Sequence, residues 1–266
     1  MKKNPLWRSA AAMALLAGTV ANSPASTWSG VATADAFVAT GAAGNPAGTD
    51  LTANNYGGAG TLAISPAGTT KGEFQSLLKF NLTAAGTQFD AQYGAGNWQI
   101  TSITLTLASN FGVQGSQPNN NIFNTINAGG FAIDWLADDS WVEGSGNPGS
   151  PGVTGVTYNS LSTLVTSGTA ALGSFTYTPP GNNVPITWTL GLPTAFTSDA
   201  AAAGDVSFLL HATAGSTVGY LFNSKTFASN NPLITITAVP EPGTVTLLLS
   251  GVAALGLTLR RLRRQS

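Results

Sequence analysis

The sequence contains no cysteine and a single histidine. Disulfide bonds and cysteine-ligated zinc are therefore excluded, and one histidine cannot build a histidine metal cluster. Basic residues are scarce between residues 26 and 239. This segment contains only three of them, Lys71, Lys79 and Lys225, but ten acidic residues. With all of these groups ionised this segment carries a net charge of −7, although the whole chain carries −1. Such an acidic segment argues against nucleic-acid binding, which requires a basic surface for the phosphates.

Charge of either sign is rare throughout, since Asp, Glu, Lys and Arg make up only 8% of the chain. Disordered segments usually combine high charge with few β-branched and aromatic residues. This chain shows the opposite composition, with many Thr, Val, Ile, Phe and Trp residues. We therefore predict a folded domain with polar loops.

Long apolar runs are confined to the two ends of the chain. At the N-terminus, three basic residues precede an apolar stretch at 10–20, and small residues lead to a cleavage site after Ala25. This order predicts a signal peptide over residues 1–25, and therefore export by the secretion machinery.

The C-terminal segment, 239–266, combines three features in a fixed order. A short motif comes first, an uncharged run at 243–259 follows, and a cluster of arginines ends it. The run predicts a short transmembrane helix, and the arginines should keep the C-terminus in the cytoplasm. The motif residues are Val239, Pro240, Glu241 and Pro242, and the arginines are Arg260, Arg261, Arg263 and Arg264.

Together with the leader, this segment resembles the PEP-CTERM sorting tail of exported bacterial proteins. The resemblance implies a Gram-negative host and cleavage near the motif by a membrane-embedded exosortase. It also implies transient anchoring in the inner membrane, followed by delivery to the cell surface or the extracellular matrix. Pro240, Glu241 and Pro242 would be the recognition residues.

The segment between the two ends, 26–238, alternates apolar and polar residues with a period of two, which is typical of β-strands. No stretch combines a clear helical period with caps, and the best helix candidate is 198–204, after a possible Ser198 cap. We predict a single all-β domain, a jelly-roll-like sandwich of about 10–11 short strands. The expected strands are 34–40, 61–65, 73–82, 99–109, 130–136, 154–158, 173–178, 184–190, 206–212, 217–222 and 233–239.

A second resemblance concerns this β domain. The segments 35–38, 54–57, 76–82 and 141–144 follow one another as in the DNRLRE-type β-sandwich modules of secreted proteins. Some relatives of these modules are carbohydrate-binding modules, so the resemblance implies a β-sandwich and leaves sugar binding as one possible role.

The densest polar segment, 134–143, holds four acidic residues and two tryptophans. Asp138, Asp139 and Glu143 could supply the oxygen ligands of a Ca²⁺ ion, although their spacing is not that of an EF-hand. The alternative is a solvated acidic turn between two strands. Trp141 lies beside these acids and could stack on a sugar ring; its alternative role is core packing.

A catalytic function has little support in the sequence. A hydrolytic triad needs a nucleophile, a base and an orienting group, yet His211 lies in an apolar strand and no Gly-x-Ser-x-Gly motif occurs. We therefore expect a non-enzymatic surface or matrix protein associated with extracellular polysaccharide or biofilm. The alternatives are a carbohydrate-binding module with a defined site near Trp141 and a polysaccharide-active enzyme using two carboxylates.

Overall fold

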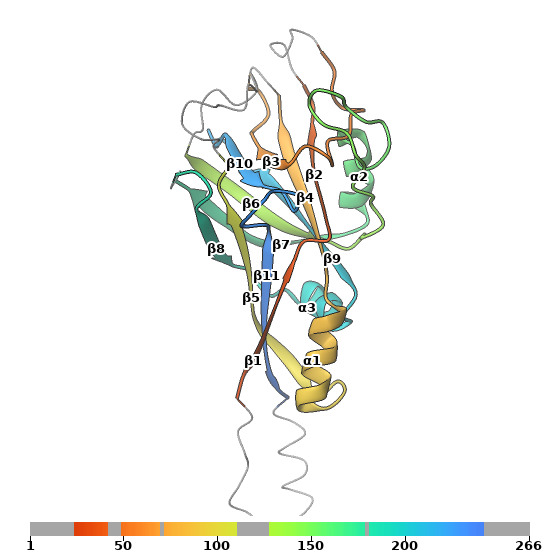
Figure 1. Ribbon diagram of the computed structural model, residues 1–266, viewed down its shortest axis with the longest axis vertical. Helices are drawn as coiled ribbons and strands as arrows, with labels where there is room; N and C mark the ends of the chain where they lie inside the picture. The colour runs from red at the N-terminus through yellow and green to blue at the C-terminus, as the bar shows by residue number, and fades with distance from the viewer. Residues whose placement is uncertain (1–23, 42–48, 70–71, 111–127, 179–180, 242–266) are drawn as a thin grey trace, which may run out of the picture. The chain divides into compact units, whose positions relative to one another are not determined.

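The computed structural model describes residues 24–41, 49–69, 72–110, 128–178 and 181–241. Within these ranges the chain is mostly β, with eleven strands and three helices (Figure 1). The strands are β1 (Ser26–Val31), β2 (Ala34–Ala39), β3 (Thr61–Ile64), β4 (Phe74–Asn81), β5 (Trp98–Ala108), β6 (Gly129–Leu136), β7 (Thr169–Tyr177), β8 (Pro185–Thr189), β9 (Asp205–Ala212), β10 (Tyr220–Asn223) and β11 (Leu233–Pro240). The helices are α1 (Thr83–Tyr93), α2 (Tyr158–Thr166) and α3 (Thr194–Ala201).

The strands pair into three sheets in the described ranges. The five-stranded sheet has the order β2-β4-β9-β6-β7, the four-stranded sheet β1-β11-β5-β8, and the small sheet β10-β3. Neighbours in the five-stranded sheet are antiparallel, as are β5 with β8 and β3 with β10. The prediction of a mostly β protein is therefore confirmed, and the antiparallel sheets are consistent with a sandwich.

The chain divides into two compact units. The first combines residues 89–99 with both ends of the chain, of which 24–26 and 238–241 are described. The second contains residues 27–88 and 100–237, and therefore most of every sheet. Each unit is considered by itself below.

An aromatic core joins the three sheets of the second unit. Phe131 of β6 lies edge-on to Trp188 of β8, with 5.3 Å between ring centroids, and to Phe222 of β10, with 6.1 Å. Because these rings come from three sheets, the inner faces must pack against one another. Edge-on aromatic pairs add stability beyond the area that they bury. Trp188 is 8% exposed and is therefore a core residue.

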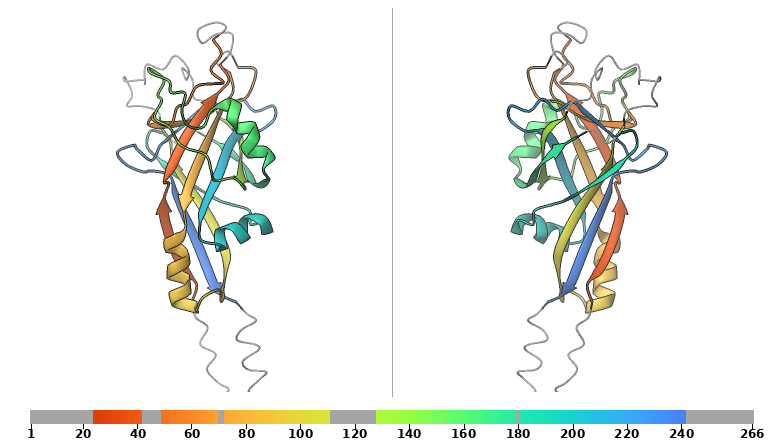
Figure 2. Two further views of the ribbon diagram at one scale, coloured as in Figure 1. Left: turned by 90° about the vertical axis from the view of Figure 1, so that its right-hand side faces the viewer. Right: turned by 90° about the vertical axis from the view of Figure 1, so that its left-hand side faces the viewer.

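Helix α2 covers part of the outer face of the five-stranded sheet (Figure 2). Its buried residues Leu161 and Leu164 pack in one cluster with Val38, Leu77 and Leu209 from three neighbouring strands. This sheet is therefore buried on both faces at this point, which explains why β2 reads as an apolar run instead of an alternating one.

The start of α2 corrects one predicted strand. Residues 154–158 were expected to be extended, but Thr157 is the N-cap of α2. The Thr157 hydroxyl accepts a hydrogen bond from the Ser160 backbone, and the Ser160 hydroxyl accepts one from the Thr157 backbone. This reciprocal capping box fixes the helix start. The expectation that the domain has no capped helix is wrong.

The other ten predicted strands overlap observed ones, whereas β1 and α1 were not predicted. The helix expected at 198–204 is α3, which begins earlier, after Pro193 in place of Ser198. Among the described helices, none is long and apolar enough to cross a membrane. The leader up to residue 23, the predicted span 243–259 and the arginines at 260–264 lie outside the described residues.

Candidate functional site

The sequence motif at 239–242 begins inside the folded first unit. Val239 and Pro240 are the last residues of β11. The backbone N–H of Glu241 donates a hydrogen bond to the Asn97 carbonyl, with 2.9 Å between N and O. Three of the four motif residues are therefore held by the fold, and Pro242 lies outside the described residues.

The turn that carries Asn97 is fixed by Asp90. One carboxylate oxygen of Asp90 accepts from the Gly96 backbone N–H at 3.2 Å and from the Trp98 indole N–H at 2.7 Å. Gly94 and Gly96 have φ angles of 90° and 69°, a region that residues with a Cβ rarely adopt. The turn is therefore set by its own sequence, and it presents the Asn97 carbonyl to Glu241.

Tyr93 contacts both ends of the described chain. Its hydroxyl donates to the Pro24 carbonyl at 2.7 Å and lies 3.2 Å from the Ala238 carbonyl. Figure 1 shows the start of β1 and the end of β11 beside the last turn of α1. We call Asp90, Tyr93 and the turn 94–97 the terminal clasp. Because the hydroxyl has one proton, the two carbonyls share a single donor.

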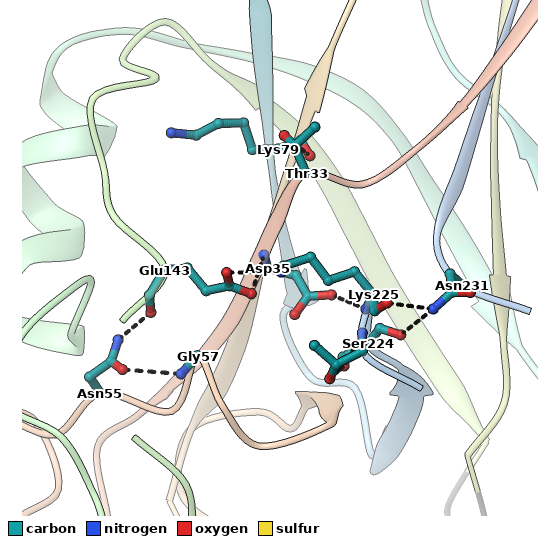
Figure 3. A network of polar contacts seen from close by, with 10 residues as sticks. Thr33, Asp35, Asn55, Gly57, Lys79, Glu143, Ser224, Lys225 and Asn231 are labelled. Carbon is teal, nitrogen blue, oxygen red and sulfur yellow. Dashed lines mark hydrogen bonds and ion pairs between the residues drawn. The ribbon is translucent and has the colours of Figure 1, made fainter. Parts of the chain in front are cut away.

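A buried polar network occupies the second unit (Figure 3). The Asp35 carboxylate, 1% exposed, accepts from the Lys225 backbone N–H. The Glu143 carboxylate accepts from the Asp35 backbone N–H at 3.2 Å and forms an ion pair with the Lys225 ammonium at 3.1 Å. This network links β2, the loop after β6 and the loop after β10.

Asn55 joins three loop segments next to this network (Figure 3). Its amide nitrogen donates to the carbonyls of Glu143 and Val156 at 2.7 and 2.8 Å. Its amide oxygen accepts from the backbone N–H groups of Gly57 and Gly146 at 3.1 and 3.2 Å. Asn55 is 0% exposed, and the bonds to Val156, Gly57 and Gly146 are buried.

The comparisons with known proteins concern the C-terminus. The family model for the PEP-CTERM protein-sorting motif matches residues 238–264. The chain carries a PEP-CTERM sorting motif. The motif indicates export, a membrane-anchored stage and processing by exosortase, as the sequence resemblance implied. No curated protein matches the chain.

The three acidic residues of the predicted calcium site, Asp138, Asp139 and Glu143, do not come together in the structure. Glu143 pairs with Lys225, whereas Asp138 accepts from the Ser140 backbone in a local turn. Asp139 is half-buried, and burial raises its pKa to about 6. In the described part of the chain, no three acidic or histidine side chains are placed to hold a metal ion. These three residues are close in sequence, but their carboxylates do not share one binding site.

The predicted sugar-stacking role of Trp141 is contradicted by its burial. Trp141 is 6% exposed, and its indole N–H donates to the Ser207 hydroxyl at 2.8 Å. The Lys79 ammonium lies 4.7 Å from the ring centroid. The ring therefore has no free face for a sugar, and Trp141 is a core residue.

His211 is engaged at both ring nitrogens. Its Nε2 lies 3.0 Å from the Asp134 carboxylate, and its Nδ1 lies 3.1 Å from the Ala212 carbonyl. The hydrogen bond to Asp134 raises the pKa of His211. A general base needs a free nitrogen within reach of its substrate. The geometry therefore supports the structural role that the sequence indicated.

Stability is expected to fall as the pH rises from about 4 to about 7, because burial raises the pKa of Asp35 from 3.8 to about 7. In this interval the folded protein keeps a proton that the unfolded chain has lost, so ionisation opposes folding. Asp35→Asn cannot ionise and retains an oxygen acceptor for the Lys225 N–H. We expect it to reduce this loss by up to about 4 kcal/mol.

Urea unfolding of wild type and Asp35→Asn at pH 5 and pH 8 measures this effect. Asp50→Asn is the control, since Asp50 accepts only from Thr52 nearby in sequence. If the free energy of unfolding changes equally with pH in wild type and Asp35→Asn, ionisation of Asp35 is not the cause of the loss of stability.

Proposed function

We propose that the protein is an exported, exosortase-processed component of the cell surface or extracellular matrix, with a non-catalytic β domain that associates with extracellular polysaccharide. The observation that carries the proposal is the sorting motif at 238–264, which begins within the last strand of the domain. A domain joined this closely to its sorting motif is placed at the membrane during processing.

The non-catalytic part of the proposal rests on how the candidate groups are used. Both nitrogens of His211 already have partners. The carboxylates of Asp35 and Glu143 bind Lys225, and Asp90 fixes a turn. Each of these groups therefore has a structural role that accounts for its position.

The outer face of the four-stranded sheet supports the association with polysaccharide. Three pairs of hydroxyl groups meet across its strands: Thr27 with Thr237 at 3.3 Å, Ser29 with Thr235 at 2.8 Å, and Thr106 with Thr187 at 2.7 Å. Strands β1, β11 and β5 lie side by side in the right-hand view of Figure 2. These hydroxyls donate and accept hydrogen bonds without bringing charge, which suits a polymer that is itself rich in hydroxyl groups.

The expected result in the native host is a wild-type protein in the surface or matrix fraction, without its C-terminal arginines. In a strain that lacks exosortase, we expect the intact tail and retention in the inner membrane, because the apolar run is not removed. Cell fractionation and intact-mass measurement distinguish the two outcomes. Retention of the wild-type protein on the host's purified exopolysaccharide tests the association.

Two results would contradict parts of this proposal. If the wild-type protein stays in the inner membrane with its tail intact, the proposed display at the cell surface is wrong. If the protein is displayed at the surface but is not retained on exopolysaccharide, the proposed association with polysaccharide is wrong and the proposed display still holds.

A further inference from the structure

The sorting motif is not a free peptide following the domain, because its first residues belong to the first unit. Val239 and Pro240 continue β11, and the Glu241 N–H is bonded to Asn97. A protease acts on backbone that is accessible, and a hydrogen-bonded segment must open locally before it can be cut. The peptide bonds as far as Glu241 are therefore protected by the fold.

The protection depends on side chains outside the motif. Asp90 holds the turn that carries the Asn97 carbonyl, through its bonds to Gly96 and Trp98. The ring of Trp98 also packs on Phe89, with 5.1 Å between centroids. Tyr93 reaches the carbonyl of Ala238, one residue before the motif. These residues come from 89–98, so the motif is held by a distant part of the chain.

We propose that the terminal clasp directs exosortase to peptide bonds on the C-terminal side of Glu241. This inference rests on the proposed exosortase processing and adds the position of the cut. The C–N bond of one peptide unit breaks, and its acyl group passes to water, or to an amine if the product is attached; the nitrogen of the broken bond gains the proton that this nucleophile loses and leaves as the amino end of the released tail. The mature protein then retains all of β11 and ends at or beyond Glu241.

The N-terminal leader also affects the clasp. The Tyr93 hydroxyl donates to the Pro24 carbonyl, which the predicted cleavage after Ala25 removes. The Ala238 carbonyl is the remaining acceptor within reach of that hydroxyl. When the leader is removed, the Tyr93 hydroxyl donates its proton to the Ala238 carbonyl alone. The hydrogen bond between the terminal clasp and β11 is therefore stronger before the tail is cut.

The test uses the full-length precursor in its native host, with the C-termini of the products determined by intact mass. Asp90→Ala leaves two donors without their shared acceptor, and Tyr93→Phe removes the hydroxyl that holds Ala238. We expect products that end before Glu241 to rise about tenfold in Asp90→Ala and less in Tyr93→Phe, since cleavage follows the population of the opened segment. Wild type should end at or beyond Glu241.

Matched controls separate the clasp from general effects of substitution. Thr87→Ala changes an exposed residue of the same helix whose hydroxyl bonds only within α1. Tyr158→Phe removes a hydroxyl that bonds to Glu73, far from the clasp in sequence. Both controls should give wild-type ends. Asp90→Asn keeps an oxygen acceptor and should also give wild-type ends, and Tyr93→Phe alone carries the test if Asp90→Ala does not accumulate.

Three results would overturn the inference or its basis. Wild-type product that ends before Glu241 shows that the clasp does not protect these bonds. Identical ends in wild type, Asp90→Ala and Tyr93→Phe show that the cut is fixed by the motif alone. An uncut tail in wild type contradicts the proposed exosortase processing itself. This result differs from the first two, in which the tail is cut.

Discussion

Asn55→Ala is expected to lower the free energy of unfolding by about 3–5 kcal/mol. The substitution leaves the buried carbonyl of Val156 and the partly buried carbonyl of Glu143 without their donor. It also leaves the N–H groups of Gly57 and Gly146 without their acceptor. Water cannot replace these partners easily, since the side chain is 0% exposed. Each buried polar group left without a partner costs about 1–3 kcal/mol.

The close packing around Asn55 prevents relaxation that would reduce this cost. A Cβ added at Gly146 would lie 2.0 Å from the Asn55 carbonyl oxygen. The backbone of Asn55 is also bonded in both directions to Gly152, at 2.8 and 3.1 Å. The loops therefore meet at fixed separations, and an alanine side chain leaves a polar cavity among them.

Urea unfolding followed by tryptophan fluorescence measures the effect of Asn55→Ala. Asn147→Ala is the matched control, because Asn147 accepts from Gly149 and Ser150 in an exposed turn. We expect the control to change the free energy of unfolding by less than about 1 kcal/mol. A comparably small change in Asn55→Ala would show that the three loop segments are held together by other contacts.

Trp141→Ala is expected to destabilise the protein by about 3–5 kcal/mol. The substitution opens a cavity in a cluster with Val156, Leu161 and Leu164. It also removes the hydrogen bond to Ser207 and the aromatic face below the Lys79 ammonium. Helix α2 shares this cluster, so its contact with the sheet should weaken as well.

The same variant distinguishes a core residue from a sugar-binding one. Thermal unfolding should show a lower Tm, while retention on exopolysaccharide at a temperature where the variant is folded should match wild type. Trp28→Ala is the control, because Trp28 is only partly buried on strand β1. Unchanged stability with lost retention would restore the ligand-binding role for Trp141.

The strands were predictable because alternation of side chains is a local property. In β5, for example, Ile103, Leu105 and Leu107 are buried, and the threonines between them are not. Helix α2 was not predicted because its serines and threonines obscure the helical period. Its capping box, Thr157 with Ser160, was the available signal.

The candidate sites were less predictable because they depend on residues far apart in sequence. Glu143 lies next to Asp138 and Asp139 along the chain, yet its carboxylate pairs with Lys225 from the loop after β10. Trp141 has acidic neighbours in sequence but is covered by Lys79 and Ser207 from β4 and β9. The sorting motif was found because its order of residues alone defines it. Its contact with Asn97 left no pattern in the sequence.

Strand β1 is hydrogen-bonded to β11, and this pairing has a consequence for folding kinetics. The Thr27 and Thr237 hydroxyls that meet across these strands are 210 positions apart in the chain. Contacts of such long range are slow to form, because a large loop must close before they add stability. The four-stranded sheet also cannot close until its last strand has been synthesised and has crossed the membrane. The four-stranded sheet should therefore be completed only after β11 has been exported, and the arrival of this strand sets the earliest time at which the sheet can close.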